Sequence, residues 1–267
     1  MRHRKHNRVG GTLASIALYV LSAFALAAPK VDTMTVRYPS GMDTIQAFLC
    51  VPQSKGVHPA IVVIHEWWGL NDWVKQNAQA LASMGYITVA VDLYRGKSTA
   101  LPDVAHELSR GLPDDRATRD LIGAVQYLKS RPDVDRSRIG SIGWCSGGGY
   151  SLTAALNVSD LAACAICYGR LVTDSMSIKK IPCPILGIFG EDDQGITPED
   201  VRKFESQCKA AGKAIDVHIY PKSGHAFMNP NNKKGYNKAA AKDAWSKIYG
   251  FFFRTLERMH TETPGKQ

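Results

Sequence analysis

The segment Gly143-Trp144-Cys145-Ser146-Gly147-Gly148-Gly149 decides the fold that we expect for this chain. It follows an apolar stretch at 139–144 with the character of a buried strand and precedes an Ala-rich helical stretch near 150–156. The pattern Gly-x-nucleophile-x-Gly between a strand and a helix is typical of a nucleophile elbow, a tight turn that lifts one side chain above the carboxyl end of a sheet. Glycines at 143 and 147 suit this turn, because a side chain there would clash with the adjoining elements. The segment therefore predicts a reactive residue at Cys145.

Apolar runs and helical patterns alternate on both sides of this segment. The runs with strand character are 60–64, 87–91, 139–144, 161–168, 184–189 and 215–220, and the helical stretches are 74–84, 119–128, 150–156, 198–211 and 238–258. This alternation predicts parallel strands joined by crossover helices. We therefore expect one α/β domain, with a mostly parallel open sheet and helices on both faces. A closed (β/α)8 barrel is the alternative of similar size, but the elbow favours the open sheet.

The first 27 residues have the features of a secretory signal peptide. A basic start is followed by an apolar run at 13–26 and by the small-x-small site Ala25-Leu26-Ala27. An uncleaved membrane anchor is the alternative, but the run is short for a span of about 20 residues. We expect a signal peptide at 1–27 and a mature domain at 28–267 that is secreted across the inner membrane into the periplasm.

The charge of the chain does not point to a polymeric partner. Its formal net charge of +9 includes four basic residues of the leader, and the other basic residues are spread without a dense stripe. A nucleic-acid interface is therefore not expected, nor is a membrane partner after cleavage. The partner that we expect is a small-molecule ester or lactone.

Neither a metal nor a cofactor is predicted. Cys164 and Cys167 have CxxC spacing, but they lie in an apolar strand-like run, where residues three apart point to opposite faces. His65-Glu66 resembles the start of a zinc motif, but Gly69 stands where the second histidine belongs. The pairing of the other cysteines in disulfides stays open.

Cys145 is the predicted nucleophile. It precedes a helix, whose N-terminus favours a thiolate over a thiol, and the backbone N–H of Ser146 is placed to stabilise an oxyanion. A small buried cysteine is one alternative. A phosphate loop is another, but no Lys-Ser/Thr follows the glycines. Ser146 as the nucleophile would break the register of the turn.

The base and the acid of a triad follow in chain order. In hydrolases with this elbow the order is nucleophile, acid, histidine. His225 lies in a turn after the last predicted strand, and Asp192 and Asp193 follow the strand before it. A structural histidine and turn or capping aspartates are the alternatives, and the residues alone do not separate Asp192 from Asp193.

The loop His65-Glu66-Trp67-Trp68-Gly69-Leu70-Asn71 follows the predicted strand 60–64. In this type of hydrolase that loop donates a second oxyanion N–H, for which Trp67 is placed. Glu66 beside it is within reach of the nucleophile, with a surface carboxylate as the alternative. Trp67 and Trp68 are equally suited to form a pocket wall.

Five motifs in register resemble those of the dienelactone hydrolase family, with its α/β-hydrolase fold. They are the Glu66 loop, Asp92-Leu-Tyr94-Arg95, Gly-Trp-Cys145-Ser-Gly-Gly, Gly190-Glu-Asp-Asp193 and Ser-Gly-His225-Ala-Phe. The resemblance implies a Cys-His-Asp triad that hydrolyses ester or lactone bonds through a thioester. It selects Asp193, the fourth residue of its turn, and implies that Glu66 deprotonates a resting thiol when substrate binds.

The substrate is less defined. The resemblance implies two arginines that anchor a substrate carboxylate. Arg95, beside Tyr94, takes the first place, whereas Asn229 stands near the second and brings no charge. We therefore expect a preference for neutral or less acidic esters. The alternatives are a broad carboxylesterase or thioesterase and a non-catalytic, ligand-binding member of the fold.

Overall fold

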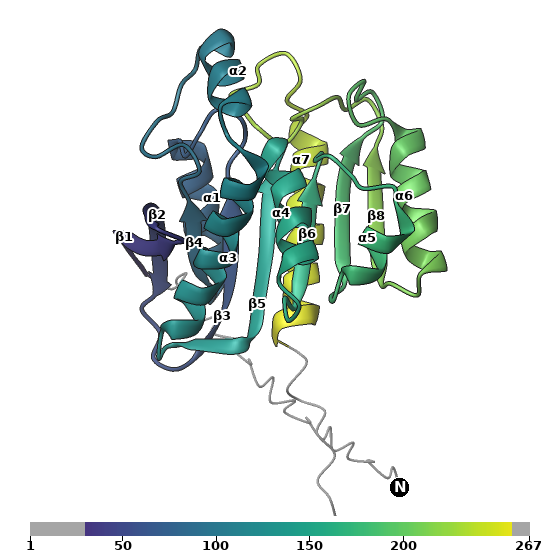
Figure 1. Cartoon of the computed structure of the whole chain (residues 1–267). Coiled ribbons are helices and arrows are strands. Elements are labelled where there is room, and N and C mark those ends of the chain that lie inside the picture. The colour runs from purple at the N-terminus through teal and green to yellow at the C-terminus, as the bar shows by residue number, and fades with distance from the viewer. Residues whose placement is uncertain (1–29, 258–267) are drawn as a thin grey trace, which may run out of the picture.

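A computed structural model of the chain describes residues 30–257, which form one α/β domain around an eight-stranded sheet (Figure 1). The strand order is β1-β2-β4-β3-β5-β6-β7-β8. The strands are β1 (Val31–Ser40), β2 (Asp43–Pro52), β3 (His58–Ile64), β4 (Ile87–Val91), β5 (Val134–Trp144), β6 (Ala163–Cys167), β7 (Ile185–Gly190) and β8 (Ile215–Tyr220). β1 and β2 pair antiparallel, as do β2 and β4, and every other pairing is parallel.

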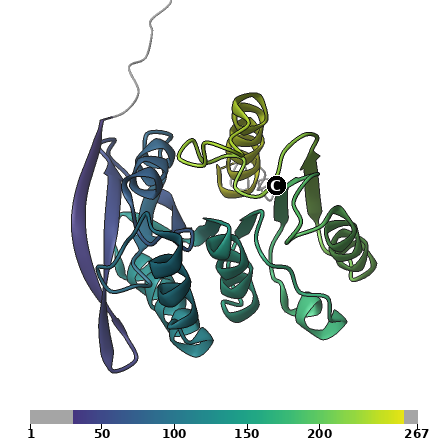
Figure 2. The same cartoon turned by 90° about the horizontal axis from the view of Figure 1, so that it is seen from above.

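Helices cover both faces of this sheet, as Figure 2 shows from above. Helices α1 (Asp72–Ala82) and α7 (Lys238–Phe252) pack with one apolar cluster, and α3 (Asp114–Ser130), α4 (Ser146–Asn157), α5 (Ser175–Lys180) and α6 (Pro198–Ala210) pack with the other. The short helix α2 (Pro102–Arg110) buries only Ala105, and a π-helical turn, Phe253–Glu257, follows α7. The predicted open, mostly parallel sheet with helices on both faces is therefore confirmed, and the closed barrel is excluded.

The structure contains elements that the sequence prediction lacked, among them β1, β2, α2 and α5. The hairpin of β1 and β2 adds an antiparallel edge to the six parallel strands, and β5 starts at Val134, earlier than expected. Cys164 and Cys167 both lie in β6 and belong to different apolar clusters, so their side chains point to opposite faces as predicted. All six cysteines are free thiols.

The predicted signal peptide at 1–27 lies outside the described residues. Between residues 30 and 257, no helix combines the length and the apolar character that a membrane span requires.

The parallel strands bring their carboxyl ends to one edge of the sheet. Cys145 follows β5, the Glu66 loop follows β3, Asp193 follows β7 and His225 follows β8. Four residues that are far apart in the sequence therefore meet at this edge, where open α/β sheets bind their ligands.

Candidate active site

Cys145 occupies a strained turn between β5 and α4. Its φ of 56° is left-handed, a conformation that costs a non-glycine residue of the order of 1–3 kcal/mol. Its N–H donates to Cys167 O at 3.0 Å, and its carbonyl accepts from Gly148 N at 3.0 Å. A Cβ on Gly143 would lie 2.0 Å from Gly147 O, and one on Gly147 would lie 2.3 Å from Ile64 O. Only glycine fits at these two positions, as the elbow pattern predicts.

His225 and Asp193 form a hydrogen-bonded pair. The distance from His225 Nδ1 to Asp193 Oδ2 is 2.7 Å. The other carboxylate oxygen of Asp193 accepts from the backbone N–H groups of Gly195 and Ile196, and the residue is 2% exposed. Asp192 is exposed, and its side chain makes no hydrogen bond to the described chain. Asp193 therefore has the position that an orienting carboxylate requires, and Asp192 does not.

The charges of this pair support each other. Burial acts against the imidazolium, but the interactions with Asp193 and with the neighbouring Cys145 outweigh it and raise the pKa of His225. Burial also acts against the Asp193 carboxylate, but the hydrogen bond and charge of His225 and the two backbone donors hold its pKa below the usual value. An imidazolium that is stabilised in this way can hold a proton between a thiol and a leaving group.

Glu66 is buried, which excludes the surface alternative. It is 1% exposed, and its Oε2 accepts a hydrogen bond from Asn229 Nδ2 at 2.6 Å. Its Oε1 makes no hydrogen bond in the described chain, nor does the buried hydroxyl of Tyr168. Burial raises the pKa of Glu66 to about 7, against the opposing influence of Asn229, His225 and Tyr168. This carboxyl group can therefore exchange a proton near neutral pH.

His65 fixes the backbone of the loop that carries Glu66. Its Nε2 lies 3.3 Å from the Leu93 N–H and must accept, so its Nδ1 donates to Glu66 O at 2.6 Å. Burial lowers the pKa of His65, in agreement with this neutral form. His65 was not among the predicted site residues, because in sequence it stands out only as part of an incomplete zinc motif.

The two backbone N–H groups predicted to stabilise an oxyanion have no partner in the described part of the chain. Neither Ser146 N nor Trp67 N donates a hydrogen bond within residues 30–257. Ser146 is the first residue of α4, where the helix dipole adds positive potential. Free donors of this kind are what a developing oxyanion requires.

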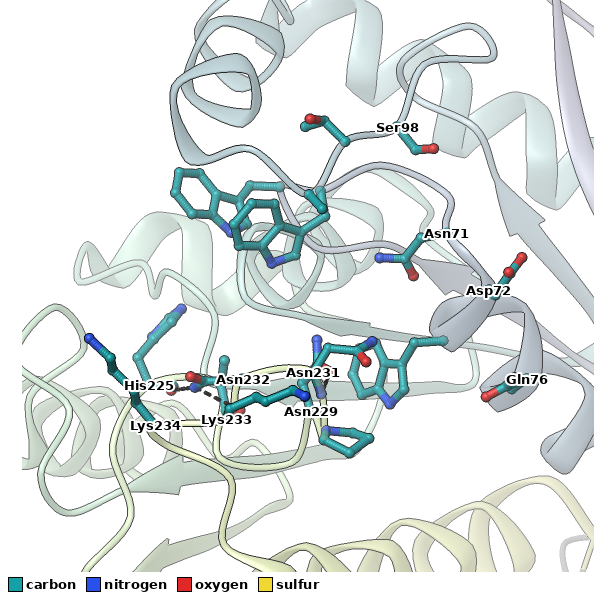
Figure 3. Close-up of a pocket in the computed structure, with 17 residues that line it drawn as sticks. Asn71, Asp72, Gln76, Ser98, His225, Asn229, Asn231, Asn232, Lys233 and Lys234 are labelled. Atoms are coloured by element: carbon teal, nitrogen blue, oxygen red, sulfur yellow. Dashed lines mark hydrogen bonds between the residues drawn. The ribbon is translucent and has the colours of Figure 1, made fainter.

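A pocket of about 1020 Å³ opens beside His225 (Figure 3). Of the predicted residues, Trp67, Trp68, His225 and Asn229 line it. The rings of Trp67 and Trp68 lie 4.6 Å apart, so the predicted pocket wall is present. The other lining residues, which the prediction did not include, are Asn71, Asp72, Trp73, Gln76, Ser98, Thr99, Ala100, Ala226, Pro230, Asn231, Asn232, Lys233 and Lys234.

Arg95 does not lie in this pocket. Its guanidinium donates to both carboxylate oxygens of Asp120, at 2.7 and 3.0 Å, and to Asp43 at 2.8 Å. Asp120 is fully buried, so it needs this charge, and the arginine is held there instead of facing a substrate. Tyr94 is also buried and packs against the ring of His65 at 4.7 Å, outside the pocket lining. Neither residue therefore lines this pocket, and the substrate-binding roles predicted for Arg95 and Tyr94 stay predictions.

Asn229 lines the pocket, but its amide is already occupied. Its Nδ2 donates to Glu66, and its Oδ1 accepts from Asn231 N at 2.9 Å. It is 2% exposed. Asn229 was predicted to contact the substrate. The structure shows in addition that its side-chain amide binds Glu66.

Comparison with known proteins agrees with this arrangement. Residues 45–256 match the model of the dienelactone hydrolase family. Relatives in Methylorubrum extorquens (29% identical, 89% of this chain and 90% of the relative) and Salmonella typhimurium (31%, 80% and 84%) both bear the name "putative carboxymethylenebutenolidase". A dienelactone hydrolase-like promiscuous phosphotriesterase from metagenomic libraries has the same fold, with a TM-score of 0.78 at 22% identity over 85% of this chain and 99% of that one.

Proposed function

The chain belongs to the dienelactone hydrolase family and is a hydrolase of ester or lactone bonds, and on that premise we propose that it works through a Cys145-His225-Asp193 triad and a thioester acyl-enzyme. The observation that carries the proposal is the 2.7 Å hydrogen bond between His225 and a buried Asp193, next to a cysteine in a strained elbow. A purely structural histidine has no need of such a neighbour.

Acylation begins with loss of the thiol proton of Cys145. Glu66 or His225 accepts this proton, and the thiolate attacks the carbonyl carbon of the substrate. The N–H groups of Ser146 and Trp67 stabilise the oxyanion that forms. The carbon–oxygen bond then breaks, and the imidazolium of His225 donates its proton to the leaving alcohol oxygen, which leaves the acyl group on sulfur. In the branch where Glu66 takes the thiol proton, His225 is already protonated in the resting enzyme, and after deacylation the proton held by Glu66 returns to the Cys145 thiolate.

Deacylation reverses these roles. His225 takes a proton from water, and the resulting hydroxide attacks the thioester carbonyl. The carbon–sulfur bond breaks, the thiolate recovers a proton, and a carboxylic acid is released. The balance is one ester and one water converted to one acid and one alcohol, or to one hydroxy acid from a lactone.

A broad carboxylesterase or thioesterase is the second candidate. Arg95 pairs with Asp120 and Asp43, and Asn229 stands in place of the second arginine, so neither of the two arginine anchors that the family resemblance implies lines the pocket. This observation favours substrates other than carboxylated dienelactones. The non-catalytic alternative is not favoured, because family membership identifies a hydrolase.

We also propose that the protein acts after export to the periplasm. The support is the basic start, the apolar run and the small residues at 25 and 27. N-terminal sequencing of the protein recovered from the periplasmic fraction tests this, with Ala28 as the expected first residue. Retention of residues 1–27 on a membrane-bound protein would contradict it.

The mechanism is tested by trapping the acyl-enzyme. Wild type is mixed with 4-nitrophenyl acetate and quenched in acid, and intact mass is measured together with release of nitrophenol. We expect an added acetyl group that maps to Cys145 and is absent from Cys145→Ala. Two results together would contradict the thioester route. Wild type would hydrolyse the ester with no acyl group on Cys145 at any quench time, and Cys145→Ala would hydrolyse it as well.

A further inference from the structure

The pocket beside His225 is larger than the reacting bond requires. Its volume is about 1020 Å³, whereas clefts of about 300–1,000 Å³ hold ligands of drug size. A small lactone would leave most of this space filled with water. The pocket therefore fits a substrate with a large group attached to the scissile bond.

The chemistry of His225 indicates which half of the ester enters this pocket. His225 lines the pocket and Cys145 does not. Under the proposed function, on which this step rests, His225 gives its proton to the leaving alcohol oxygen. The alcohol half therefore lies on the side of His225, within the pocket.

One wall of the pocket is aromatic. Trp67 and Trp68 are half-buried, with ring planes at 55° to each other, and the ring of Trp73 contributes from the start of α1. Indole rings offer broad, flat apolar faces at low cost in side-chain entropy. Such faces fit the flat side of a ring.

The remaining wall consists largely of uncharged polar groups. The side-chain amides of Gln76 and Asn231 make no hydrogen bond to another described residue, and Asn71 uses only its Oδ1, which caps α1. Figure 3 shows Asn71 and Asn231 on opposite sides of the pocket. Amide groups both donate and accept hydrogen bonds, as hydroxyl groups do. These groups match the hydroxyl-bearing edge of a ring.

The wall that carries Asn231 is fixed relative to His225. Asn232 Nδ2 donates to His225 O at 3.1 Å, and Asn232 Oδ1 accepts from Gly235 N at 3.2 Å. The polar groups of this loop are therefore held in register with the proton donor. A preformed loop of this kind reduces the entropy lost on binding.

Lys233 and Lys234 offer a competing explanation, an anionic alcohol. Both lysines are exposed at the edge of the pocket, and an ion pair in water changes binding by a factor of about five or less. Asp72, which also lines the pocket, disfavours an anion there, and the half-buried indoles of Trp67 and Trp68 offer apolar contact that a simple anion does not use. We propose that the outer part of this pocket binds a polyhydroxylated ring, so that the substrate is an ester whose alcohol half carries a sugar-like group.

The test compares three acetate esters with a common phenolic leaving group. They are 4-acetoxyphenyl β-glucopyranoside, its cyclohexyl ether analogue without hydroxyls, and the matching β-glucuronide. We expect kcat/KM for the glucoside to exceed that for the cyclohexyl ether by about tenfold, since each hydrogen bond is worth about two- to tenfold. An equal or higher value for the cyclohexyl ether overturns the proposal.

Variants assign this preference to the pocket. Gln76→Ala combined with Asn231→Ala should reduce the glucoside preference at least threefold. Gln79→Ala, one turn along the same helix and outside the lining, should leave the preference unchanged. A preference that survives in the double variant overturns the proposal. A second result also overturns it: kcat/KM for the glucuronide exceeds that for the glucoside tenfold or more, and the variant Lys233→Gln/Lys234→Gln loses this preference. That result would identify an anion site.

A binding measurement separates failure of this inference from failure of the proposed function. If wild type hydrolyses none of these esters, the proposed function fails for them, but binding to the pocket can still be tested. Calorimetric titration with 4-hydroxyphenyl β-glucopyranoside should then show binding that the double variant weakens. Absence of binding to wild type overturns the inference, whatever the mechanism.

Discussion

The side-chain amide of Asn229 donates a hydrogen bond to Glu66, with 2.6 Å between Nδ2 and Oε2, and both residues are almost fully buried. The partner of the carboxyl group is neutral, so it offsets only part of the cost of burying a negative charge. The pKa of Glu66 is accordingly raised to about 7. A carboxyl group that titrates near neutrality suits a proton acceptor that is needed only when substrate is bound.

Removing the Cys145 thiol should abolish hydrolysis. We expect Cys145→Ala to lose turnover of an aryl ester and to keep its fold, because alanine retains the turn. A stoichiometric alkylating agent should label Cys145 first, because the other five cysteines are buried. Peptide mass spectrometry and thermal unfolding provide the measurements. Activity retained in Cys145→Ala would remove the nucleophile assignment.

Asp193→Asn should reduce kcat far more than Asp192→Asn. Only Asp193 bonds to His225, and asparagine there cannot stabilise the imidazolium. Loss of the corresponding carboxylate costs a serine protease about 10⁴-fold, and a cysteine, which ionises more easily, should depend on it less. Steady-state kinetics on both variants give the comparison. Equal, small effects would place the orienting acid elsewhere.

Glu66→Gln should slow acylation and also change the dependence of stability on pH. Glu66 ionises near pH 7 in the folded protein and near about 4.3 when unfolded, so its burial costs about 4 kcal/mol above pH 7 and nothing below pH 4. The variant should therefore gain stability over wild type as the pH rises from about 4 to 7, and the difference should stay constant above that.

Two measurements check this prediction. Stopped-flow release of nitrophenol reports acylation, and urea unfolding at several pH values reports stability. If Glu66→Gln acylates at the wild-type rate, Glu66 does not activate Cys145. The thiol would then be activated by His225 and by the N-terminus of α4 alone. A stability difference independent of pH would mean that Glu66 stays in one protonation state across this range.

Residues with local signals were the predictable part of the site. The elbow and the chain order pointed to Cys145, His225 and the Asp192–Asp193 pair, because each depends on neighbours in sequence and on the parallel topology, and the family resemblance selected Asp193 from that pair. The β1–β2 hairpin was missed because its pairing depends on contacts at the sheet edge. The ion pairs of Arg95 were not predicted, because its partners, Asp43 and Asp120, come from elements far away in the sequence.

Arg95→Leu should destabilise the fold without changing substrate choice. The variant leaves the buried Asp120 carboxylate without its counter-charge, at a cost of about 3 kcal/mol. Arg119→Leu is the matched control, since its pair with Asp115 is exposed and worth about 0.3–0.5 kcal/mol. Urea unfolding measures both. A fall in kcat/KM confined to carboxylated substrates, with stability intact, would restore a substrate-binding role to Arg95.

Wild type should prefer a neutral aryl ester to a dienelactone of similar size, judged by kcat/KM. A carboxylate that enters this pocket meets the amide of Asn229, and that amide already donates to Glu66. Asn229→Arg supplies a guanidinium, which can bind two carboxylates through separate N–H groups. It should therefore shift the ratio toward the dienelactone.

The control for this substitution is Asn231→Arg, which adds the same charge at the exposed edge of the pocket. There the guanidinium is screened by solvent, so the shift should be smaller. Equal shifts would mean that general charge, and not the position beside Glu66, sets the preference. A strong preference of wild type for the dienelactone would contradict the prediction outright. Lys233 and Lys234, the two cationic residues that line the pocket with His225, would then be the carboxylate anchors to test.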